Sequence, residues 1–435
     1  MARFGPFETA PRLAVAVSGG ADSLALCFLA ADWVRNRGGT LLVLTVDHGL
    51  RSTSAAEAEW VCNTLNEHGI PCKILTWENT KPRSGIQKKA RHARYTLLLE
   101  YCRKQLIHYL LLGHQANDQA ETVFMRLSRG SGLDGLAAIQ PIVITPSVLI
   151  LRPLLDVKEE RLAATLRSRH QQWLEDPTNQ DSRFLRTIVR SILRECRTYG
   201  LSCSDFSACS EKAATARDAL SRAVSSLLAK CCRVTSTGMA VVEPGLLASA
   251  SEEIGWRALG RIVACVGGAE WPPSPSALRR QFRSLGLTTR QPPPGTLSRC
   301  RFIRRSKGLI VCRERRNLPV SQSINAGQSI YWDGRFRLRI PASFRSSVGH
   351  LQVKPLSSAM WQEIVAQQPE RRRANIPAEA RYSLPAIVDQ EGVFAVPNLG
   401  FIRHVRHSQT FLRAWSVFQP RRTLTGSAAF LEIAR

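Results

Sequence analysis

The chain of 435 residues carries 60 lysine and arginine residues against 34 aspartate and glutamate residues, a formal net charge of +26 at pH 7. Its 44% hydrophobic and 22% charged residues are typical of a globular protein, and its length predicts two to four domains. No stretch approaches the roughly 18 uninterrupted apolar residues of a membrane span, and the first residues lack an apolar leader. We therefore expect a cytoplasmic protein without membrane contact.

Most of the excess positive charge lies in the second half of the chain. Residues 1–205 contain 26 basic and 20 acidic side chains, whereas residues 206–435 contain 34 basic and 14 acidic side chains. Arginine clusters with interleaved aromatic side chains attract a polyanion, which favours nucleic acid as the partner. The alternative is an arginine-rich chain whose charges only solvate its surface. The candidate contacts to nucleic acid in these clusters are Arg301, Arg304, Arg371 and Arg372.

The twelve cysteines are scattered and form no C-x-x-C pair. This pattern argues against a zinc ribbon, an iron–sulfur cluster of that kind and a thioredoxin-like redox site. We interpret the cysteines as reduced thiols without a special role.

Short apolar runs alternate with longer segments of helical spacing in the first half of the chain. This alternation predicts right-handed βαβ units and an α/β fold, in which a doubly wound, mainly parallel sheet lies between two layers of helices. Binding sites in such folds lie at the carboxyl ends of the strands. The predicted strands cover residues 13–17, 41–46, 72–76 and 107–112, and the predicted helices between them cover residues 21–36, 55–68 and 88–103.

The alternation ends before residue 206. Helical spacing continues over residues 157–171 and 183–197, and a long helix is expected over residues 207–232. Proline-rich turns and short strands, such as 309–312 and 335–340, then predict smaller α+β modules. We divide the chain into a catalytic domain (1–205), a helical connector (206–232) and two small basic α+β domains that we expect to bind nucleic acid (233–316 and 317–435).

A glycine pair directly follows the first predicted strand and precedes the first predicted helix. Two glycines let backbone amides approach an anion without an intervening Cβ, and the free N–H groups at the start of the helix favour its negative charge. A plain βα turn needs only the glycines and leaves the adjacent hydroxyl and carboxylate side chains unexplained. The stretch therefore predicts a phosphate site made by Ser18, Gly19, Gly20, Ala21, Asp22 and Ser23.

This loop lacks the lysine with which a Walker-type loop contacts the terminal phosphates during γ-phosphoryl transfer. Its pattern S-G-G-x-D-S resembles the pyrophosphate loop of the ATP pyrophosphatases, which adenylate a carbonyl oxygen and release pyrophosphate. The motifs DHGLR (47–51) and GHQANDQAET (113–122) resemble those of one branch, the tRNA(Ile)-lysidine synthases. The resemblance extends through ARHARY (90–95), RGSGLDGLA (129–137), RPLL (152–155) and WLEDPTNQDSRFLRTIVR (173–190).

The resemblance implies a ligase that uses ATP and Mg²⁺. In this family ATP activates carbon 2 of the wobble cytidine in a tRNA(Ile) with a CAU anticodon, through an adenylated intermediate. The amine of free L-lysine then displaces AMP, and the product is lysidine. Whether the chain forms a homodimer stays open at this stage.

Four carboxylates are the expected catalytic groups. Asp118 and Glu121 lie three residues apart at the start of a predicted helix, so their side chains share one face. Acidic residues are also favoured there by the helix dipole alone. Asp47 ends the second predicted strand, beside the phosphate loop. We expect Asp22, Asp47, Asp118 and Glu121 to be catalytic, with Asp22 and Asp118 also binding Mg²⁺.

Several basic side chains complete the expected site. Arg91 and Arg129 are expected to balance the charge of ATP, although a solvated helix face is an alternative for Arg91. Arg186 and Arg190 are further candidate contacts to tRNA. His48 and His114 are candidate acid–base groups, but histidines without a visible partner are more often structural.

The third motif departs from the pattern common in the family. Gln115 and Asn117 stand where many members have a second histidine and an aspartate, and Thr187 stands where asparagine usually follows arginine. Two other functions remain open. A tRNA 2-thiolation enzyme of the same superfamily commonly carries C-x-x-C pairs, which this chain lacks, and a non-catalytic tRNA-binding protein would not need an intact phosphate loop.

Overall fold

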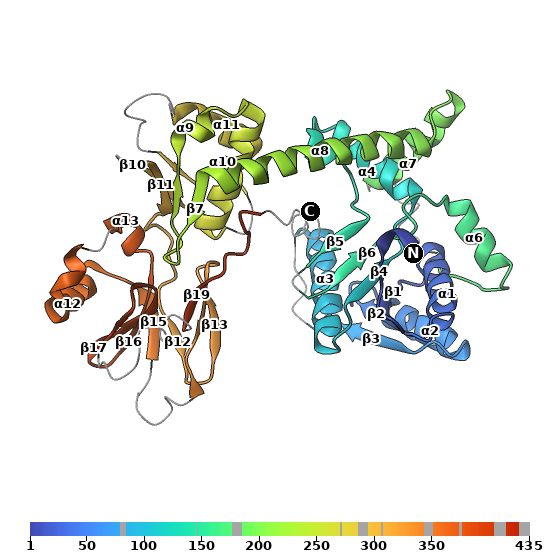
Figure 1. Ribbon diagram of the computed structural model, residues 1–435. Helices are drawn as coiled ribbons and strands as arrows, with labels where there is room; N and C mark the ends of the chain where they lie inside the picture. The colour runs from blue at the N-terminus through green and yellow to red at the C-terminus, as the bar shows by residue number, and fades with distance from the viewer. Residues whose placement is uncertain are drawn as a thin grey trace. The chain divides into compact units, whose positions relative to one another are not determined.

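Six strands form the sheet of the N-terminal part in the computed structural model (Figure 1). They lie in the order β3-β2-β1-β4-β6-β5, with β5 antiparallel to β6 and every other neighbouring pair parallel. The predicted doubly wound α/β fold is confirmed. The strands are β1 (Arg12–Ala16), β2 (Thr40–Asp47), β3 (Cys72–Thr76), β4 (Tyr109–Leu112), β5 (Ile142–Ile144) and β6 (Leu149–Leu151).

The structure describes most of the chain in two compact units, Met1–Ala219 and Leu220–Ser427. Part of the motif at 173–190 lies outside the described residues. The borders expected at residues 205, 232 and 316 remain predictions. The described residues are 1–78, 84–145, 147–175, 185–269, 272–285, 295–305, 308–342, 351–373, 376–403 and 415–425.

Helices cover both faces of the six-stranded sheet because successive side chains of each strand point to opposite faces. Leu13 and Val15 pack against α1, α2 and α6, whereas Ala14 belongs to a second core with α3. Figure 1 shows α3 on the opposite side of the sheet from α1 and α2. The helices of this unit are α1 (Ala21–Arg35), α2 (Ser54–Glu67), α3 (Ile86–Lys104), α4 (Ala116–Leu127), α5 (Leu133–Leu136), α6 (Glu159–Arg167) and α7 (Leu185–Thr198).

The strand order determines where in the sheet a binding site is expected. The chain runs outward from β1 to β2 and β3, and then returns through α3 to β4, which pairs with the other edge of β1. The turns after β1 and β4 therefore meet at the carboxyl ends of adjacent strands, where the direction of the strand order changes. The phosphate loop (18–23) follows β1, and the first residues of GHQANDQAET (113–115, here the GHQ motif) follow β4, so both meet at this point.

The long helix expected over residues 207–232 is α8 (Cys203–Cys231), which runs from the first unit into the second. Antiparallel sheets follow it, in the orders β7-β8-β11-β10-β9, β12-β15-β16-β17-β18 and β13-β14-β19. No helix among the described residues is long and apolar enough to span a membrane. The helices are α9 (Pro244–Ala248), α10 (Glu252–Gly267), α11 (Pro275–Ser284), α12 (Ser358–Gln367) and α13 (Ala378–Arg381). The strands are β7 (Cys232–Val234), β8 (Ala240–Val242), β9 (Thr296–Leu297), β10 (Cys300–Arg305), β11 (Gly308–Arg313), β12 (Gln322–Ile324), β13 (Ser329–Trp332), β14 (Phe336–Arg339), β15 (Leu351–Pro355), β16 (Pro385–Asp389), β17 (Gly392–Val396), β18 (Phe401–Ile402) and β19 (Ser416–Phe418).

A buried ion cluster joins two of these sheets. Asp333, after β13, accepts hydrogen bonds from Arg313 at the end of β11 and from Arg335, at 3.1 and 2.8 Å. The two arginine side chains are 0% exposed and the Asp333 side chain is 2% exposed. Removing one partner of such a cluster costs about 3–5 kcal/mol because the remaining charge stays buried. The cluster therefore ties the β7–β11 sheet to the strands that follow it.

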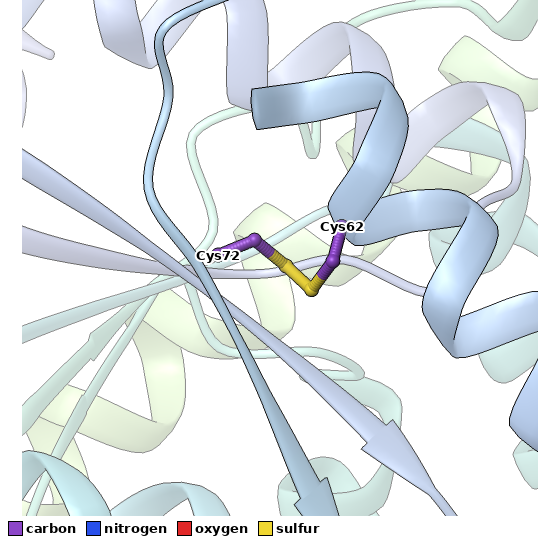
Figure 2. The surroundings of a disulfide bond; sticks show 2 residues. All are labelled: Cys62 and Cys72. Atoms are coloured by element: carbon purple, nitrogen blue, oxygen red, sulfur yellow. A yellow bond between two sulfur atoms is a disulfide. The ribbon is translucent and has the colours of Figure 1, made fainter. Parts of the chain in front are cut away.

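Cys62 of α2 and Cys72 at the start of β3 form a disulfide bond (Figure 2). The interpretation of all twelve cysteines as reduced thiols without a role is therefore wrong for these two. Their separation of ten residues gives no recognised motif. They meet because the chain reverses direction after α2 and enters β3 antiparallel to that helix.

Candidate functional site

The phosphate loop is held by the side chain of Ser23 in the first turn of α1. Its hydroxyl donates to the carbonyl of Gly20 at 2.9 Å and accepts from the amide of Ser18 at 3.1 Å. Ser23 is 8% exposed, so these bonds form away from water. The serine therefore closes the loop on itself, which leaves the loop geometry set before any ligand arrives.

The two glycines of the loop have different conformations. Gly19 has φ +88°, in the left-handed region that favours glycine, whereas Gly20 has φ −71°. A Cβ on Gly19 would stand 2.7 Å from Cδ1 of Leu174, whose amide donates to the Gly19 carbonyl at 2.9 Å. Gly113, directly after β4, lies nearly as close to its neighbours, since its Cβ would stand 3.0 Å from the Cα of Ser23. Backbone conformation and close packing therefore favour glycine at 19, and close packing against the backbone of α1 favours it at 113.

The structure brings the six predicted loop residues together at the start of α1. Helix α1 begins at Ala21, so its first N–H groups lack partners within the helix and carry the positive end of its dipole. An anion is stabilised at such a position, and Asp22 is the acidic side chain within it. An anionic ligand therefore needs a cation to offset Asp22.

The pKa of Asp22 is raised from its usual 3.8 to about 7, chiefly by burial and then by the charges of the neighbouring carboxylates Asp118 and Glu159. A hydrogen bond from Gln115 and the charge of Arg190 oppose these effects. One carboxylate oxygen of Asp22, Oδ1, is buried without a hydrogen-bond partner. A buried oxygen without a donor, beside two further carboxylates, is an environment that favours a bound cation.

Gln115 and Asp118 cap the N-terminus of α4. The Gln115 side chain accepts from the Asn117 amide at 2.6 Å, and the Asp118 carboxylate accepts from the Gln115 amide at 3.1 Å. A cap of this kind stabilises a helix by about 0.5–2 kcal/mol. Asn117 donates to Glu159 at 2.8 Å. The residues that depart from the family pattern at 115 and 117 thus order α4 and, through Gln115, contact Asp22.

Glu121 is almost completely buried and forms an ion pair with α7. Its Oε1 accepts from Nε of Arg190 at 2.6 Å, and its Oε2 lies 3.6 Å from Nε of Arg186. Burial raises the pKa of Glu121, and the hydrogen bond from Arg190 lowers it. Arg186 and Arg190, which the sequence suggested as tRNA contacts, therefore face a carboxylate of the same unit and dock α7 onto α4.

Asp47 ends β2 and turns the chain. Its Oδ1 accepts from the amide of Gly49 at 2.9 Å and from the hydroxyl of Ser54. His48 accepts through Nδ1 from the amide of Leu50 at 3.1 Å. Asp47 and His48 thus order the DHGLR turn at the carboxyl end of the strand next to β1.

A group of cations surrounds the GHQ motif. Burial lowers the pKa of Arg91, and the charges of Arg94, Arg186 and Arg152 lower it further. Nε of Arg91 is buried without a hydrogen-bond partner, while Nη2 donates to the Tyr95 hydroxyl at 3.3 Å. This group carries an excess of positive charge that an anion would offset. Arg129 is exposed after α4 and makes no hydrogen bond or ion pair with the described residues.

The four arginines predicted in the second unit have different surroundings. Arg301 lies 3.9 Å from Glu379, and Arg372 is exposed. Arg371 donates to the carbonyls of Leu399 and Gly400, so its guanidinium orders a loop of the same unit. Arg304 lines a cavity of about 650 Å³ in which the basic side chains outnumber the acidic one. The charged residues of this cavity are Lys230, Arg233, Glu243, Arg304 and Arg305.

Several residues of the site were not found from the sequence. Leu174 and Arg152 lie in the stretches 173–190 and 152–155 that carry the family resemblance, but the sequence assigned neither a role in the site, and Glu159 lies in no such stretch. Arg152 follows β6 directly and is 2% exposed. Each reaches the site through tertiary contacts that connect distant segments.

Comparisons with known proteins agree with this geometry. Residues 2–196 match a family model described as a PP-loop domain. The tRNA(Ile)-lysidine synthase of Ruegeria pomeroyi is 35% identical over 330 residues, covering 76% of this chain and 77% of the relative. That of Orientia tsutsugamushi is 30% identical over 434 residues, covering 97% of this chain and 96% of the relative.

Among solved structures, the U34-tRNA thiolase NcsA from Methanococcus maripaludis matches at 19% identity and a TM-score of 0.42, covering 47% of this chain and 73% of the thiolase. This likeness is too remote to bear on the reaction. The similarity to the synthases, in contrast, extends from the phosphate loop through most of the second unit. With its lysine-free phosphate loop, its GHQ motif and this similarity, the chain belongs to the tRNA(Ile)-lysidine synthase family of enzymes.

Proposed function

We propose that the protein ligates free lysine to carbon 2 of the wobble cytidine in a tRNA(Ile) with a CAU anticodon. The observation that carries this proposal is the lysine-free phosphate loop, closed by Ser23 and flanked by Asp22 and the GHQ motif, in a member of this family. We also propose that the reaction takes place in the cytoplasm, where tRNA is modified.

The first step joins the two substrates that the site is built to position. The C2 oxygen of cytosine attacks the α-phosphorus of ATP, the bond to the β-phosphate breaks, and pyrophosphate leaves. The N–H groups at the start of α1 and the amides of Gly19 and Gly20 lie where they stabilise the negative charge of pyrophosphate. Arg91, with an unpartnered buried Nε, supplies further positive charge.

In the second step the lysine amine attacks C2, AMP leaves with the oxygen, and the amine loses a proton to a base. Asp118 is a better candidate for this base than Glu121, because Glu121 is paired with the charged Arg190, whereas Asp118 accepts a hydrogen bond from the neutral amide of Gln115. Both steps use one activated carbon held between bound substrates, and such positioning lowers a barrier by about 7–11 kcal/mol in favourable cases.

Mg²⁺ fits the carboxylates beside the loop. Asp22 offers a buried oxygen without a partner, and Asp118 lies close enough to raise the Asp22 pKa. The described residues contain no group of three or more acidic, histidine or cysteine side chains that would hold a metal alone. Asp22 and Asp118 together with phosphate oxygens would hold Mg²⁺, as is usual for this ion. When bound, Mg²⁺ neutralises charge on the phosphates.

The basic cavity of the second unit suits the phosphate backbone of tRNA. It is lined by Lys230, Arg233, Arg304 and Arg305, with Glu243 as the one acidic lining residue in this part of the structure. Replacing Arg304 and Arg305 with glutamine should weaken tRNA binding and reduce the slope of log affinity against log salt by about 0.7–0.9 for each lost phosphate contact.

A control for that experiment is Arg283→Gln on α11. It removes one positive charge where the double variant removes two, and Arg283 pairs with Glu252 and does not line the cavity. It should leave the salt slope near that of the wild type. Equal slopes for the double variant and the wild type would place the tRNA contacts elsewhere.

The reaction is tested by comparing two transcripts, one with a CAU anticodon and one with its wobble cytidine replaced by uridine. The first should support release of AMP and pyrophosphate and incorporation of labelled lysine. The second should support neither, since a site that binds the 4-amino group of cytosine discriminates against its loss by as much as about 10⁴-fold. Equal incorporation into both transcripts would rule out the proposal.

A further inference from the structure

Arg152 is a buried cation beside the GHQ motif. It follows β6, its side chain is 2% exposed, and its Nη1 donates to the carbonyl of Gln140 at 2.6 Å. It also hydrogen-bonds the Tyr95 hydroxyl, and its Nε donates to Nδ1 of His114 at 3.3 Å. All these partners are neutral acceptors, and no described carboxylate forms an ion pair with Arg152.

The bond between Arg152 and His114 determines the position of a proton. A guanidinium carries only donors and does not lose its proton in proteins, so Nδ1 of His114 must be the acceptor. A protonated imidazolium has no lone pair on Nδ1 and cannot accept. His114 is therefore neutral, and its remaining N–H is on Nε2.

We propose that Arg152 is a positioning residue that fixes His114 as the neutral Nε2–H tautomer, so that His114 donates a hydrogen bond to a phosphate oxygen of the bound nucleotide. This inference rests on the proposed function for the identity of the nucleotide. It replaces the expectation that His114 is an acid–base group, because the basic nitrogen of the ring is already occupied by Arg152.

The position of His114 suits a phosphate ligand. It follows Gly113, whose Cα packs against the backbone of Ser23 and Asp22 so closely that a Cβ would stand 3.0 to 3.2 Å from their atoms. The backbone of His114 therefore directly follows a residue that contacts the phosphate loop. Loss of solvation and the charge of Arg152 hold the pKa of His114 well below its usual range, and Arg91, Arg94 and Arg186 act in the same direction.

The tautomer is measured directly by NMR on the full-length protein with ¹⁵N-labelled histidine, without substrates. The chain has nine histidines, and the variant His114→Gln identifies the signal to be followed. We expect a neutral Nε2–H ring that does not titrate between pH 5.5 and 8. A signal from the Nδ1–H tautomer, or titration with an ordinary pKa near 6.5, would overturn the proposal.

The variant Arg152→Met removes the donor and its charge at similar side-chain length. In this variant His114 should populate both tautomers and its pKa should move toward the ordinary value, while Arg152→Lys should restore part of the wild-type spectrum. An unchanged His114 signal in Arg152→Met would show that Arg152 does not set the tautomer. If Arg152→Met does not fold, the wild-type spectrum still tests whether His114 is the neutral Nε2–H tautomer.

The role of His114 is tested by comparing His114→Gln with His114→Ala. Glutamine keeps an N–H donor but is no base, so the glutamine variant should keep a KM for ATP within a few-fold of the wild type. The alanine variant should raise it by about tenfold or more, with tRNA affinity unchanged. Equal loss of kcat in both variants would identify His114 as a proton acceptor and refute the inference.

These outcomes are separable from the proposed function. If the protein makes no lysidine, the tautomer and the ATP affinity are still measured with the protein and nucleotide alone.

Discussion

Leu174 covers the phosphate loop by contacting Gly19 twice: its amide donates to the Gly19 carbonyl at 2.9 Å, and its side chain fills the space where a Cβ on Gly19 would stand. The conformation of the loop therefore depends on a segment more than 150 residues later in the chain, as well as on β1, which directly precedes the loop. This contact makes the two glycines of the loop unequal.

Gly19→Ala should destabilise the protein. The alanine would adopt φ +88°, at a cost of about 1–2 kcal/mol, and its Cβ would collide with Leu174. Gly20→Ala is the matched control, because φ is −71° and the nearest atom to its Cβ is Ser18 Oγ at 3.9 Å. Urea unfolding of the ligand-free protein compares them. Equal stability of the two variants would contradict the described loop geometry.

Asp22→Asn should stabilise the protein at alkaline pH in the absence of ATP and Mg²⁺, while abolishing activity. Burial raises the pKa of Asp22 to about 7 from 3.8. Between these values the folded protein keeps a proton that the unfolded chain releases, so the free energy of unfolding falls as pH rises through this window.

Above pH 7 the folded protein carries the full free-energy cost of keeping the ionised Asp22 carboxylate buried, and asparagine removes this cost. At pH 8 the variant should therefore unfold at higher urea concentration than the wild type, by about 1 kcal/mol or more, and the difference should close toward pH 4. A variant that is less stable than the wild type at pH 8 would show that Asp22 is not held in the charge-disfavouring environment described.

Glu121→Gln should destabilise the protein by about 1–3 kcal/mol, because Arg190 would lose the charge of its partner in a site where Glu121 is 1% exposed. Arg186→Gln is the control, since Arg186 is 48% exposed and its Nε lies 3.6 Å from Glu121. It should change stability by less than about 0.5 kcal/mol. Thermal unfolding of the three proteins tests the ranking, and a larger effect of Arg186→Gln would contradict it.

Reduction of the bond between Cys62 and Cys72 should lower the free energy of unfolding by about 3 kcal/mol, since the bond closes a span of ten residues in the unfolded chain. Urea unfolding with and without dithiothreitol measures this difference. The double variant Cys62→Ser with Cys72→Ser should unfold at the same urea concentration in both conditions. Equal effects of dithiothreitol on the variant and the wild type would assign the change to other cysteines.

Local sequence signals predicted the parts of the fold that depend on local structure. The apolar runs of β1 to β4, the glycine pair of the loop and the spacing of α1 to α3 follow from chain geometry over a few residues. Strands β5 and β6 have three residues each, too few for a periodic signal. Sequence reasoning placed Asp118 and Glu121 on one helix face, but it did not show that Glu121 forms an ion pair with Arg190.

The remaining parts of the site depend on contacts between distant segments. Arg152 and His114 are 38 residues apart, and Leu174 and Gly19 are further apart still. Such pairs meet because the strand order brings β4 and β6 together, and because the chain after α6 returns to the loop. The disulfide also depends on this kind of return, from α2 into β3.

The central claim is tested most directly by the mass of the nucleoside that the protein makes. The purified protein is incubated with ATP, Mg²⁺, lysine and a tRNA(Ile) transcript with a CAU anticodon, and the tRNA is digested to nucleosides. The account predicts a cytidine whose C2 oxygen is replaced by lysine, with one AMP and one pyrophosphate formed for each. A sulfur-containing nucleoside in the presence of a sulfur donor, lysine attached to the terminal adenosine, or unmodified cytidine would contradict it.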